Sequence, residues 1–525
     1  MADRVVIGLD SSTQSTKAIA WSMQGKAVAE GRAAIPMSNP RLDCFEQNPL
    51  DWWQSCVTAL KGCVAALVES GVSPDAIDAL AISNQRETLA FVDNNDHASY
   101  PAIVWLDERS REEVKSFSES FGAEEIHRIT GRPVDITPCL YRYEWLRIHE
   151  PDAWENTAYF VDVQAYLVKK LCGGEYRTGS ISADPMGIVD MVSASWSQPL
   201  LQALQLEESR LPVIHPPGSL LGSIMKSVSD ETGLPANLAV YAAGGDGQCA
   251  GLGTNCTSSD RAYINLGTAV VSGIWSPDYH YNGAWRTELA AQGRGYILEN
   301  CLRSGAFLID WFVDQFVARG RADAAVFDRL ESEASDIPIG SDGLLVQPYF
   351  SGVMDPHWDM SARGVILGLS GSHGEAHIYR ALIEAITLDQ VMSTEDMETA
   401  VDQHITHYVA IGGGANSALW RQMLADASGK LVHVSTTLEA SALGAGMIAA
   451  YGAGWYDSIT EAAEAMAGEH TIVVEPNKTV SQSYRELLSI YRRLYGAVRD
   501  LNHDMVAFAG KQRRLNVAKT TVESN

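Results

Sequence analysis

Residues 4–17 read Arg-Val-Val-Ile-Gly-Leu-Asp-Ser-Ser-Thr-Gln-Ser-Thr-Lys, and this stretch decides the fold. Its apolar run predicts a buried strand that ends at Asp10, and the small hydroxyl residues after it are typical of a turn. A second strand is expected over 18–21. The pattern returns at residues 261–266, Arg-Ala-Tyr-Ile-Asn-Leu, which precede Gly267-Thr268 and a further expected strand over 269–275. Two similar α/β halves are the simplest account of this recurrence.

Length and charge limit the classes of protein that the chain can be. A chain of 525 residues is too long for one hydrophobic core, so we expect two domains. The formal charge of −26, from 39 basic and 65 acidic residues, argues against nucleic-acid binding. No run reaches about 18 uninterrupted apolar residues, and the eight cysteines form no CxxC pair. We therefore expect a cytoplasmic protein with reduced thiols and with no nucleic-acid or membrane partner.

A glycine-rich turn marks the expected domain boundary. Residues 239–248 read Ala-Val-Tyr-Ala-Ala-Gly-Gly-Asp-Gly-Gln, a short strand followed by the turn that carries Asp246. The resulting domains are residues 1–250 and 251–505, with a tail over 506–525. Phosphoryl transfer to an alcohol needs a carboxylate within reach of the nucleophilic hydroxyl, and Asp246 fits this role. The alternative is that Asp246 only caps the helix that follows, and the residues by themselves leave both interpretations open.

The two expected hairpins are candidate phosphate sites. Backbone N–H groups in such a turn can hold phosphate oxygens, with Thr13 and Lys17 as further contacts. Asp10 beside them can hold Mg²⁺, usually through water. Gly267 and Thr268 repeat the arrangement in the second half. An ordinary hairpin with a polar tip is the alternative for each turn, and only the duplication favours a grip on a polyphosphate.

A run of glycines predicts a nucleotide site. The segment Gly412-Gly413-Gly414-Ala415-Asn416 follows an expected strand over 407–411 and precedes a helix from about Ala418. Bare backbone at a strand-to-helix turn lets a ligand approach closely. A tight connection normally needs one glycine, which favours nucleotide binding over a purely structural turn.

A polyol site is expected where another predicted strand, 77–83, ends. Gln85-Arg86-Glu87 follow this strand, and Trp105 lies after the next one. Charged side chains can hydrogen-bond vicinal hydroxyls while an indole covers the carbon chain. A surface ion pair and a core tryptophan are the alternative.

Taken together, these motifs resemble the FGGY family of carbohydrate kinases from about residue 4 to residue 500. The segment Gly364-Val-Ile-Leu-Gly-Leu, then His377-Ile-Tyr-Arg-Ala-Leu-Ile-Glu, is similar to the second family signature. Further similar segments are Pro348-Tyr-Phe-Ser-Gly with Pro356-His357, and residues 412–417 with 420–426, 439–440 and 443–445. The last group is similar to xylulose kinases.

The resemblance implies two actin-like (ribonuclease H-like) domains with ATP and substrate in the cleft. Residues 1–250 would bind the sugar and 251–505 the nucleotide. Asp246 would be the general base, Asp10 would lie with Mg²⁺ and the phosphates, and residues 412–416 would cradle the nucleotide. The implied substrate contacts are Gln85, Arg86, Glu87, Trp105, Asp246 and Gln248.

The resemblance is divided over the substrate. Xylulose kinases typically have Met-His in place of Arg86-Glu87, and Asp-Asn in place of Asp246-Gly247. Arg86-Glu87 is similar to glycerol kinases and to kinases of the autoinducer-2 type, yet Thr137 replaces a substrate-contacting tyrosine of glycerol kinases. Arg142 stands in a first family signature that this chain departs from. D-xylulose is the favoured substrate.

Further substrates and protein classes stay open beside this prediction. Glycerol and an autoinducer-2-type sugar are the alternative substrates. A non-catalytic actin-like ATPase scaffold would share the duplicated hairpins and the glycine turn, and a kinase-derived binding protein without catalysis is a third class. A homodimer is open beside a monomer, because dimers are common in families of this kind.

Overall fold

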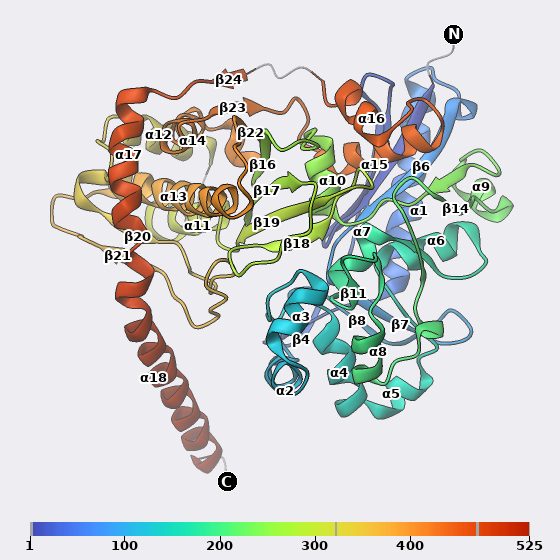
Figure 1. The fold of residues 1–525 in the computed structure, drawn as a ribbon, viewed down its shortest axis with the longest axis horizontal. Helices are drawn as coiled ribbons and strands as arrows, with labels where there is room; N and C mark the ends of the chain where they lie inside the picture. The colour runs from blue at the N-terminus through green and yellow to red at the C-terminus, as the bar shows by residue number, and fades with distance from the viewer. Residues whose placement is uncertain (1–3, 321–322, 469–471, 524–525) are drawn as a thin grey trace. The chain divides into compact units, whose positions relative to one another are not determined.

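Strand β1 (Val5–Ser11) lies inside a six-stranded sheet in the order β14-β15-β6-β1-β2-β3. It pairs antiparallel with β2 (Ser15–Trp21) and parallel with β6 (Ile77–Asn84). All seven residues of β1 are buried, as its apolar run predicts. The computed structural model in Figure 1 describes residues 4–320, 323–468 and 472–523.

The chain forms two compact units, which do not coincide with a cut at residue 250. The first comprises Met1–Tyr263, Gly273–Glu299 and Ser435–His470, and the second comprises Ile264–Ser272, Asn300–Val434 and Thr471–Asn525. Segments that follow residue 250 therefore return to the first unit. Strands β16 (Arg261–Leu266), β17 (Val270–Ser276) and β19 (Tyr296–Leu302) contribute residues to both units, and β16 and β17 confirm the predicted second pair of strands.

The first unit holds two larger sheets and the helices around them. A five-stranded sheet has the order β4-β5-β8-β7-β9. The strands of this unit are also β3 (Ala27–Ala34), β4 (Ser38–Arg41), β5 (Cys44–Gln47), β7 (Leu89–Val92), β8 (Ala98–Ile103), β9 (Tyr159–Val161), β10 (Arg177–Gly179), β11 (Val189–Asp190), β12 (Ser195–Trp196), β13 (Val213–His215), β14 (Leu220–Ser223), β15 (Ala239–Tyr241) and β18 (Arg286–Leu289). Its helices are α1 (Pro49–Glu69), α2 (Arg111–Phe121), α3 (Ala123–Thr130), α4 (Leu140–His149), α5 (Pro151–Asn156), α6 (Val163–Cys172), α7 (Ser180–Ala183), α8 (Gln198–Leu204), α9 (Lys226–Thr232), α10 (Asp246–Gly253), α15 (Ala440–Gly452) and α16 (Ile459–Met466).

Helix α1 begins where its capping residues predict. The Asn48 side chain accepts a hydrogen bond from the Leu50 N–H at 3.0 Å, and Pro49 occupies the first turn. The prediction that Trp53 lies on the core stripe is wrong in detail, because Trp52 is fully buried and Trp53 only partly. The indole N–H of Trp52 donates to Gln47 at 2.8 Å, and this contact settles which tryptophan points inward.

Helix α15 returns from late in the chain to pack against β1 and β6 (Figure 1). Gly8 permits this approach, because a Cβ at residue 8 would lie 1.8 Å from the Ala442 carbonyl oxygen. The close contact of helix and sheet explains why residues 435–470 belong to the first unit.

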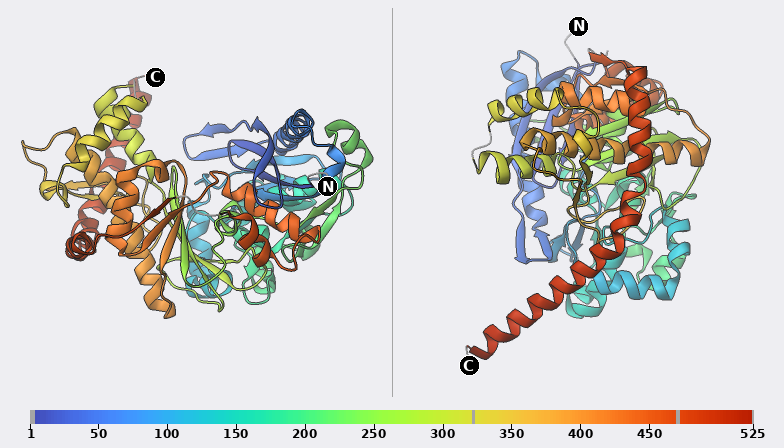
Figure 2. Two further views of the ribbon diagram at one scale, coloured as in Figure 1. Left: turned by 90° about the horizontal axis from the view of Figure 1, so that it is seen from above. Right: turned by 90° about the vertical axis from the view of Figure 1, so that its left-hand side faces the viewer.

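The second unit is built on parallel and antiparallel strands with long helices. Strand β22 (His407–Ile411) pairs parallel with β23 (Leu431–Val434), which pairs antiparallel with β24 (Ile472–Val474). The other elements are β20 (Leu345–Gln347), β21 (Val365–Leu367), α11 (Ala306–Phe312), α12 (Ala324–Ser335), α13 (Glu375–Val401), α14 (Ala418–Ser428), α17 (Lys478–Tyr491) and α18 (Leu494–Glu523). Residues 506–523 of the expected tail continue α18, which Figure 2 shows as one uninterrupted rod.

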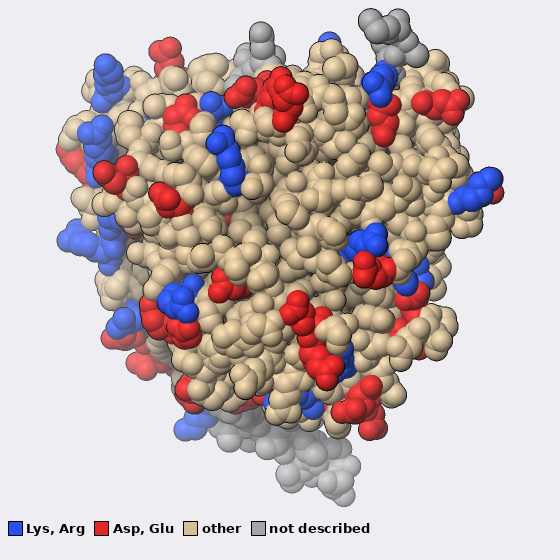
Figure 3. All heavy atoms as spheres, turned by 45° about the vertical axis from the view of Figure 1, so that its right-hand side comes forward, with Lys and Arg blue, Asp and Glu red and all other residues tan. Residues whose placement is uncertain are grey.

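The surface agrees with the expectation from charge. On the face drawn in Figure 3, acidic and basic side chains are interspersed and form no broad basic field. All eight cysteines are free. Among the described residues, no helix is both long and apolar enough to cross a membrane.

Candidate functional site

The candidate catalytic residues of the first unit lie where three neighbouring parallel strands end. In the register of β1 and β6, Asp10 pairs with Ser83 and Ser11 with Asn84, and Asn84 forms a parallel bridge to Gly245. The Ser83 hydroxyl donates to Asp10 Oδ1 at 3.0 Å. The carboxyl ends of parallel strands are where ligands bind in open α/β sheets. This topology brings the aspartates of two distant motifs together.

Asp246 is the first residue of helix α10 and keeps 38% of its side chain exposed. The N-cap position belongs to Gly245, so Asp246 is not the cap itself. Asp246 Oδ1 accepts the Gly247 N–H at 2.8 Å and lies 3.1 Å from Arg86 Nε. Burial of the surrounding site raises the pKa of Asp246, and the Arg86 charge opposes this shift. The result is an accessible carboxylate more basic than an ordinary aspartate.

Arg86 is held by two carboxylates that the sequence did not indicate. Its Nη1 donates to both oxygens of Glu288, at 2.6 and 2.7 Å, and to Glu299 at 2.9 Å. Both glutamate side chains are fully buried on strands β18 and β19. Burial would raise the pKa of Glu299, but the charges of Arg86 and Arg286 hold that pKa below its usual range. Glu299 is therefore an anionic anchor.

Glu87 is fixed by a second set of arginines. Its Oε1 accepts Arg132 Nη1 at 2.8 Å and Arg286 Nη1 at 3.3 Å. Oε2 accepts no hydrogen bond from the described residues. The backbone of Glu87 has φ of 47°, a conformation that non-glycine residues adopt rarely and that clusters at functional sites. One oxygen is thus positioned by the protein and the other is open to a ligand.

Arg142, the departure from the first family signature, supports this backbone. It is fully buried, and its guanidinium donates to the Glu87 carbonyl at 2.5 Å and to the Trp105 carbonyl at 3.2 Å. The contact joins two of the predicted polyol residues. The Thr137 hydroxyl is bound to Asp135.

The hairpin between β1 and β2 is tied to the predicted polyol residues. Trp105 Nε1 donates to the Thr13 hydroxyl at 2.9 Å, and the Gln47 amide donates to the Thr13 carbonyl at 2.6 Å. Lys17 Nζ pairs with Glu439 at 2.7 Å. Thr13 and Trp105, predicted for different ligands, are therefore direct neighbours.

Two predicted substrate contacts lie within the protein interior. Gln85 is 2% exposed and bonds Gln47 and Thr88. Gln248 is 1% exposed, and its amide donates to Asp184 at 3.1 Å. Burial and the Glu288 charge raise the pKa of Asp184. Gln85 and Gln248 are thus engaged by the protein itself.

Asp10 has the features of a cation ligand. It is 6% exposed, and burial together with the Asp246 charge raises its pKa to about 7. A divalent cation would relieve this unfavourable pair of carboxylates. The described residues contain no cluster of three or more His, Cys, Asp or Glu that could enclose a metal by itself. Asp10 therefore suits Mg²⁺ held mainly by water and phosphate.

In the second unit, the glycine run meets the Leu266-Gly267-Thr268 turn. Gly412 has φ of +85°, and a Cβ there would lie 2.5 Å from Asn265 Oδ1 and 2.9 Å from the Leu266 carbonyl. Residues Gly413–Asn416 form a short 3-10 turn before α14. Thr268, Gly413 and Asn416 are exposed. The two predicted nucleotide elements of this unit therefore adjoin and present open backbone.

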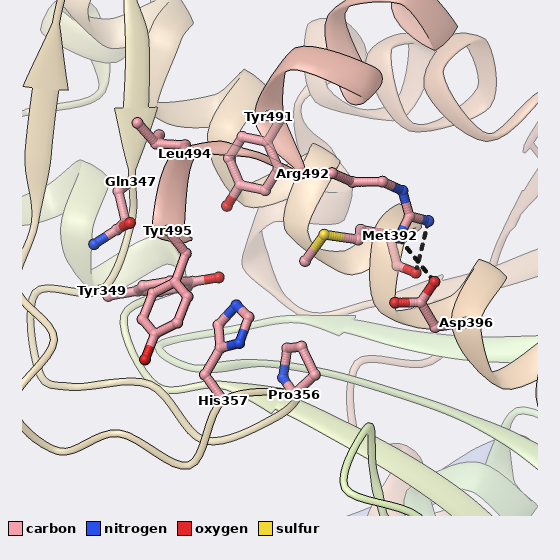
Figure 4. A pocket seen from close by; sticks show the side chains of 10 residues that line it. All are labelled: Gln347, Tyr349, Pro356, His357, Met392, Asp396, Tyr491, Arg492, Leu494 and Tyr495. Carbon is pink, nitrogen blue, oxygen red and sulfur yellow. Dashed lines mark hydrogen bonds and ion pairs between the residues drawn. The ribbon is translucent and has the colours of Figure 1, made fainter. Parts of the chain in front are cut away.

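A separate recess of about 160 Å³ in the second unit contains none of the predicted site residues (Figure 4). Along one side the His357 ring stacks on Tyr495 with centroids 3.6 Å apart. Arg492 and Asp396 form an ion pair at another side. The recess is distinct from the glycine run.

Known proteins resemble the whole chain. Two models, the N-terminal and C-terminal domains of the FGGY family of carbohydrate kinases, match residues 5–253 and 262–453. A xylulose kinase from Bacillus subtilis (strain 168) is 29% identical over 508 residues, 96% of this chain and 99% of the relative. A gluconokinase from the same organism is 25% identical over 496 residues, 93% of this chain and 95% of the relative.

The solved structure of xylulose kinase from Rhodospirillum rubrum has the same fold. Its TM-score is 0.87 at 24% identity, over 95% of this chain and all of that chain. The predicted α/β fold with two actin-like domains is thereby confirmed. The chain belongs to the FGGY family of carbohydrate kinases and is a phosphotransferase that acts on an alcohol group.

Proposed function

We propose that this kinase transfers the γ-phosphoryl group of ATP to a hydroxyl of a small neutral sugar, with D-xylulose to D-xylulose 5-phosphate as the favoured reaction. The observation that carries the proposal is the pairing of Asp246 with Arg86 and Glu87 in one unit. The likeness to a xylulose kinase along nearly the whole chain supports the choice of sugar.

Asp246 accepts the proton of the attacking hydroxyl. Its raised pKa favours proton uptake while leaving the carboxylate ionised at neutral pH, which suits a general base. Arg86 Nε orients this carboxylate from 3.1 Å. Glu87 Oε2 accepts a hydrogen bond from a neighbouring substrate hydroxyl, and Trp105 covers the carbon chain.

The nucleotide is held by backbone and small polar groups. Thr13 and Lys17 in the first unit contact phosphate, as do Gly267 and Thr268 in the second. Residues 412–416 receive the nucleoside part. The exposed Gly413, which has no atom within 4 Å of its Cβ position, supports close approach of a ligand.

Asp10 is the proposed Mg²⁺ ligand. When bound, Mg²⁺ neutralises phosphate charge and so favours phosphoryl transfer. The Ser83 hydroxyl, 3.0 Å from Asp10 Oδ1, keeps the carboxylate oriented for this contact.

The charge of the site favours a neutral substrate over a sugar acid. Five carboxylates, Glu87, Glu288, Glu299, Asp246 and Asp184, surround three guanidinium groups, Arg86, Arg132 and Arg286. Each guanidinium is already paired with a glutamate. A substrate carboxylate would therefore meet excess negative charge, which argues against gluconate although a gluconokinase is among the relatives.

Glycerol and an autoinducer-2-type sugar are the second candidates, because of Arg86-Glu87. The Thr137 hydroxyl is taken by Asp135, so it offers a glycerol-sized substrate no equivalent of the tyrosine contact. A scaffold ATPase would have no use for a buried network that positions Asp246 and Glu87.

The test is a coupled assay of ADP release with D-xylulose, D-ribulose, L-ribulose, glycerol, erythritol, gluconate and the autoinducer-2 precursor. We expect the largest kcat/KM with D-xylulose. Turnover of gluconate above every neutral sugar would contradict the charge argument, and ADP release unaffected by all of them would favour the scaffold.

A further inference from the structure

The side chain of Arg86 occupies the space beside the two glycines that flank Asp246. A Cβ at Gly245 would lie 2.8 Å from Arg86 Cδ, and a Cβ at Gly247 would lie 2.7 Å from Cζ and Nη2 and 2.8 Å from Nη1. Neither glycine has a positive φ. The absence of a side chain at these positions is therefore required by the space that Arg86 fills, and not by the backbone conformation.

The guanidinium has no free direction in which to retreat. Its Nη1 is bound by Glu288 and Glu299, both fully buried, and its Nε faces Asp246. Moving it would leave buried carboxylates without a partner, which is strongly unfavourable. A methyl group at residue 247 would consequently displace the guanidinium from several carboxylates at once.

One nitrogen of Arg86 remains for a ligand. Nη2 donates to none of the described residues, whereas Nη1 makes three hydrogen bonds. The Cβ position of Gly247 lies beside Nη2. A side chain at residue 247 would therefore cover the donor that is closest to the catalytic carboxylate.

We propose that Arg86 and Gly247 are one coupled specificity pair. Gly247 leaves the volume in which the guanidinium lies, and the guanidinium sets the direction of Asp246 and donates through Nη2 to a substrate hydroxyl. The pair accordingly selects a neutral polyol with a hydroxyl next to the one that is phosphorylated. The inference rests on the proposed function, in which Asp246 is the base, and it adds Gly247 as a positioning residue, with Glu288 and Glu299 as its anchors.

The first test needs no substrate. Gly247→Ala, Arg86→Met and the double variant are compared by thermal unfolding, with Gly496→Ala as control, because Gly496 is also helical and has no atom within 4 Å of its Cβ position. Alanine favours a helix over glycine. We expect Gly247→Ala to lower the midpoint when Arg86 is present and to leave it unchanged or raise it when methionine replaces Arg86.

An equal shift of the midpoint in both backgrounds would overturn the pair. If Arg86→Met does not fold, Arg86→Lys supplies the second background, because it keeps a positive charge beside Glu288 and Glu299 while removing the planar guanidinium. The same change of sign is expected there.

The second test measures kinetics with the best sugar of the panel. We expect Gly247→Ala to lower kcat/KM about tenfold or more beside Arg86, within the range for contacting residues, and to have little effect beside methionine. The acid limb of kcat/KM should move to higher pH, because the displaced guanidinium no longer opposes the rise in the pKa of Asp246. A Gly247→Ala enzyme with unchanged kcat/KM and an unchanged acid limb would contradict the proposal. Failure of the wild type on every sugar would refute the proposed function instead, and the unfolding cycle would still decide the pair.

Discussion

The two candidate sites of this kinase are built from different parts of the chain. In the first unit, the predicted catalytic carboxylate is positioned by charged side chains, with Arg86 bound to Glu288 and Glu299. In the second unit, the glycine run presents backbone, and Gly412 lies so close to Leu266 that no side chain fits. The comparison teaches that the first site depends on which ion pairs survive, whereas the second depends on the absence of Cβ atoms.

The largest effect is expected at the catalytic carboxylate. Asp246→Asn removes the general base and should lower kcat about 10³-fold. The amide keeps nearly the same shape, so sugar binding measured by calorimetry should change little. Activity above a few per cent of the wild type would remove Asp246 from this role.

The ion-pair side of the comparison is probed at Arg132. Arg132→Met leaves Glu87 and Glu288 each short of a partner that binds at 2.8 and 2.9 Å. We expect a loss of about 3–5 kcal/mol in the free energy of unfolding, together with a higher KM for sugar, because Glu87 loses its support.

The matched control is Arg128→Met. Arg128 pairs with Glu125 at the surface, with half of its side chain exposed, and such pairs contribute about 0–1 kcal/mol. Equal losses from Arg132→Met and Arg128→Met in denaturant titrations would show that the buried network has no special weight.

The backbone side of the comparison is probed at Gly412. Gly412→Ala forces a Cβ into contact with Asn265 at a φ of +85°, and strain of about 1–3 kcal/mol corresponds to roughly a tenfold weaker binding of ATP. Sugar affinity should be unchanged. Gly413→Ala is the control, since its Cβ meets no atom within 4 Å. Loss of sugar affinity in Gly412→Ala would break the division between the two units.

The smallest expected effect is a stabilisation. Asp10 titrates near pH 7 in the folded protein against 3.8 for a free aspartate, so the wild type loses stability as pH rises from about 4 to 7. Asp10→Asn lacks this charge and should unfold at a temperature a few degrees higher at pH 8. Near pH 4 the two proteins should melt together. A lower midpoint for Asp10→Asn at pH 8 would mean that the charge is compensated in the folded state.

Local sequence signals predicted the elements that carry the sites. The apolar run before Asp10, the Asn48-Pro49 start of α1 and the strand before the glycine run each lie where expected. Their success has a common cause, because strand burial, helix capping and glycine turns depend on residues within a few positions of each other. The wrong choice of Trp53 over Trp52 arose because the phase of a helix face depends on the sheet that it covers.

The sequence by itself therefore determined the elements, the two α/β halves and Asp246 as the candidate base. Only the tertiary structure decided what holds that base. Glu288 and Glu299 are about 200 residues from Arg86 along the chain, as their separations of 202 and 213 show. No periodicity or spacing connects such residues, because an ion pair depends on distances that exist only after the strands have packed.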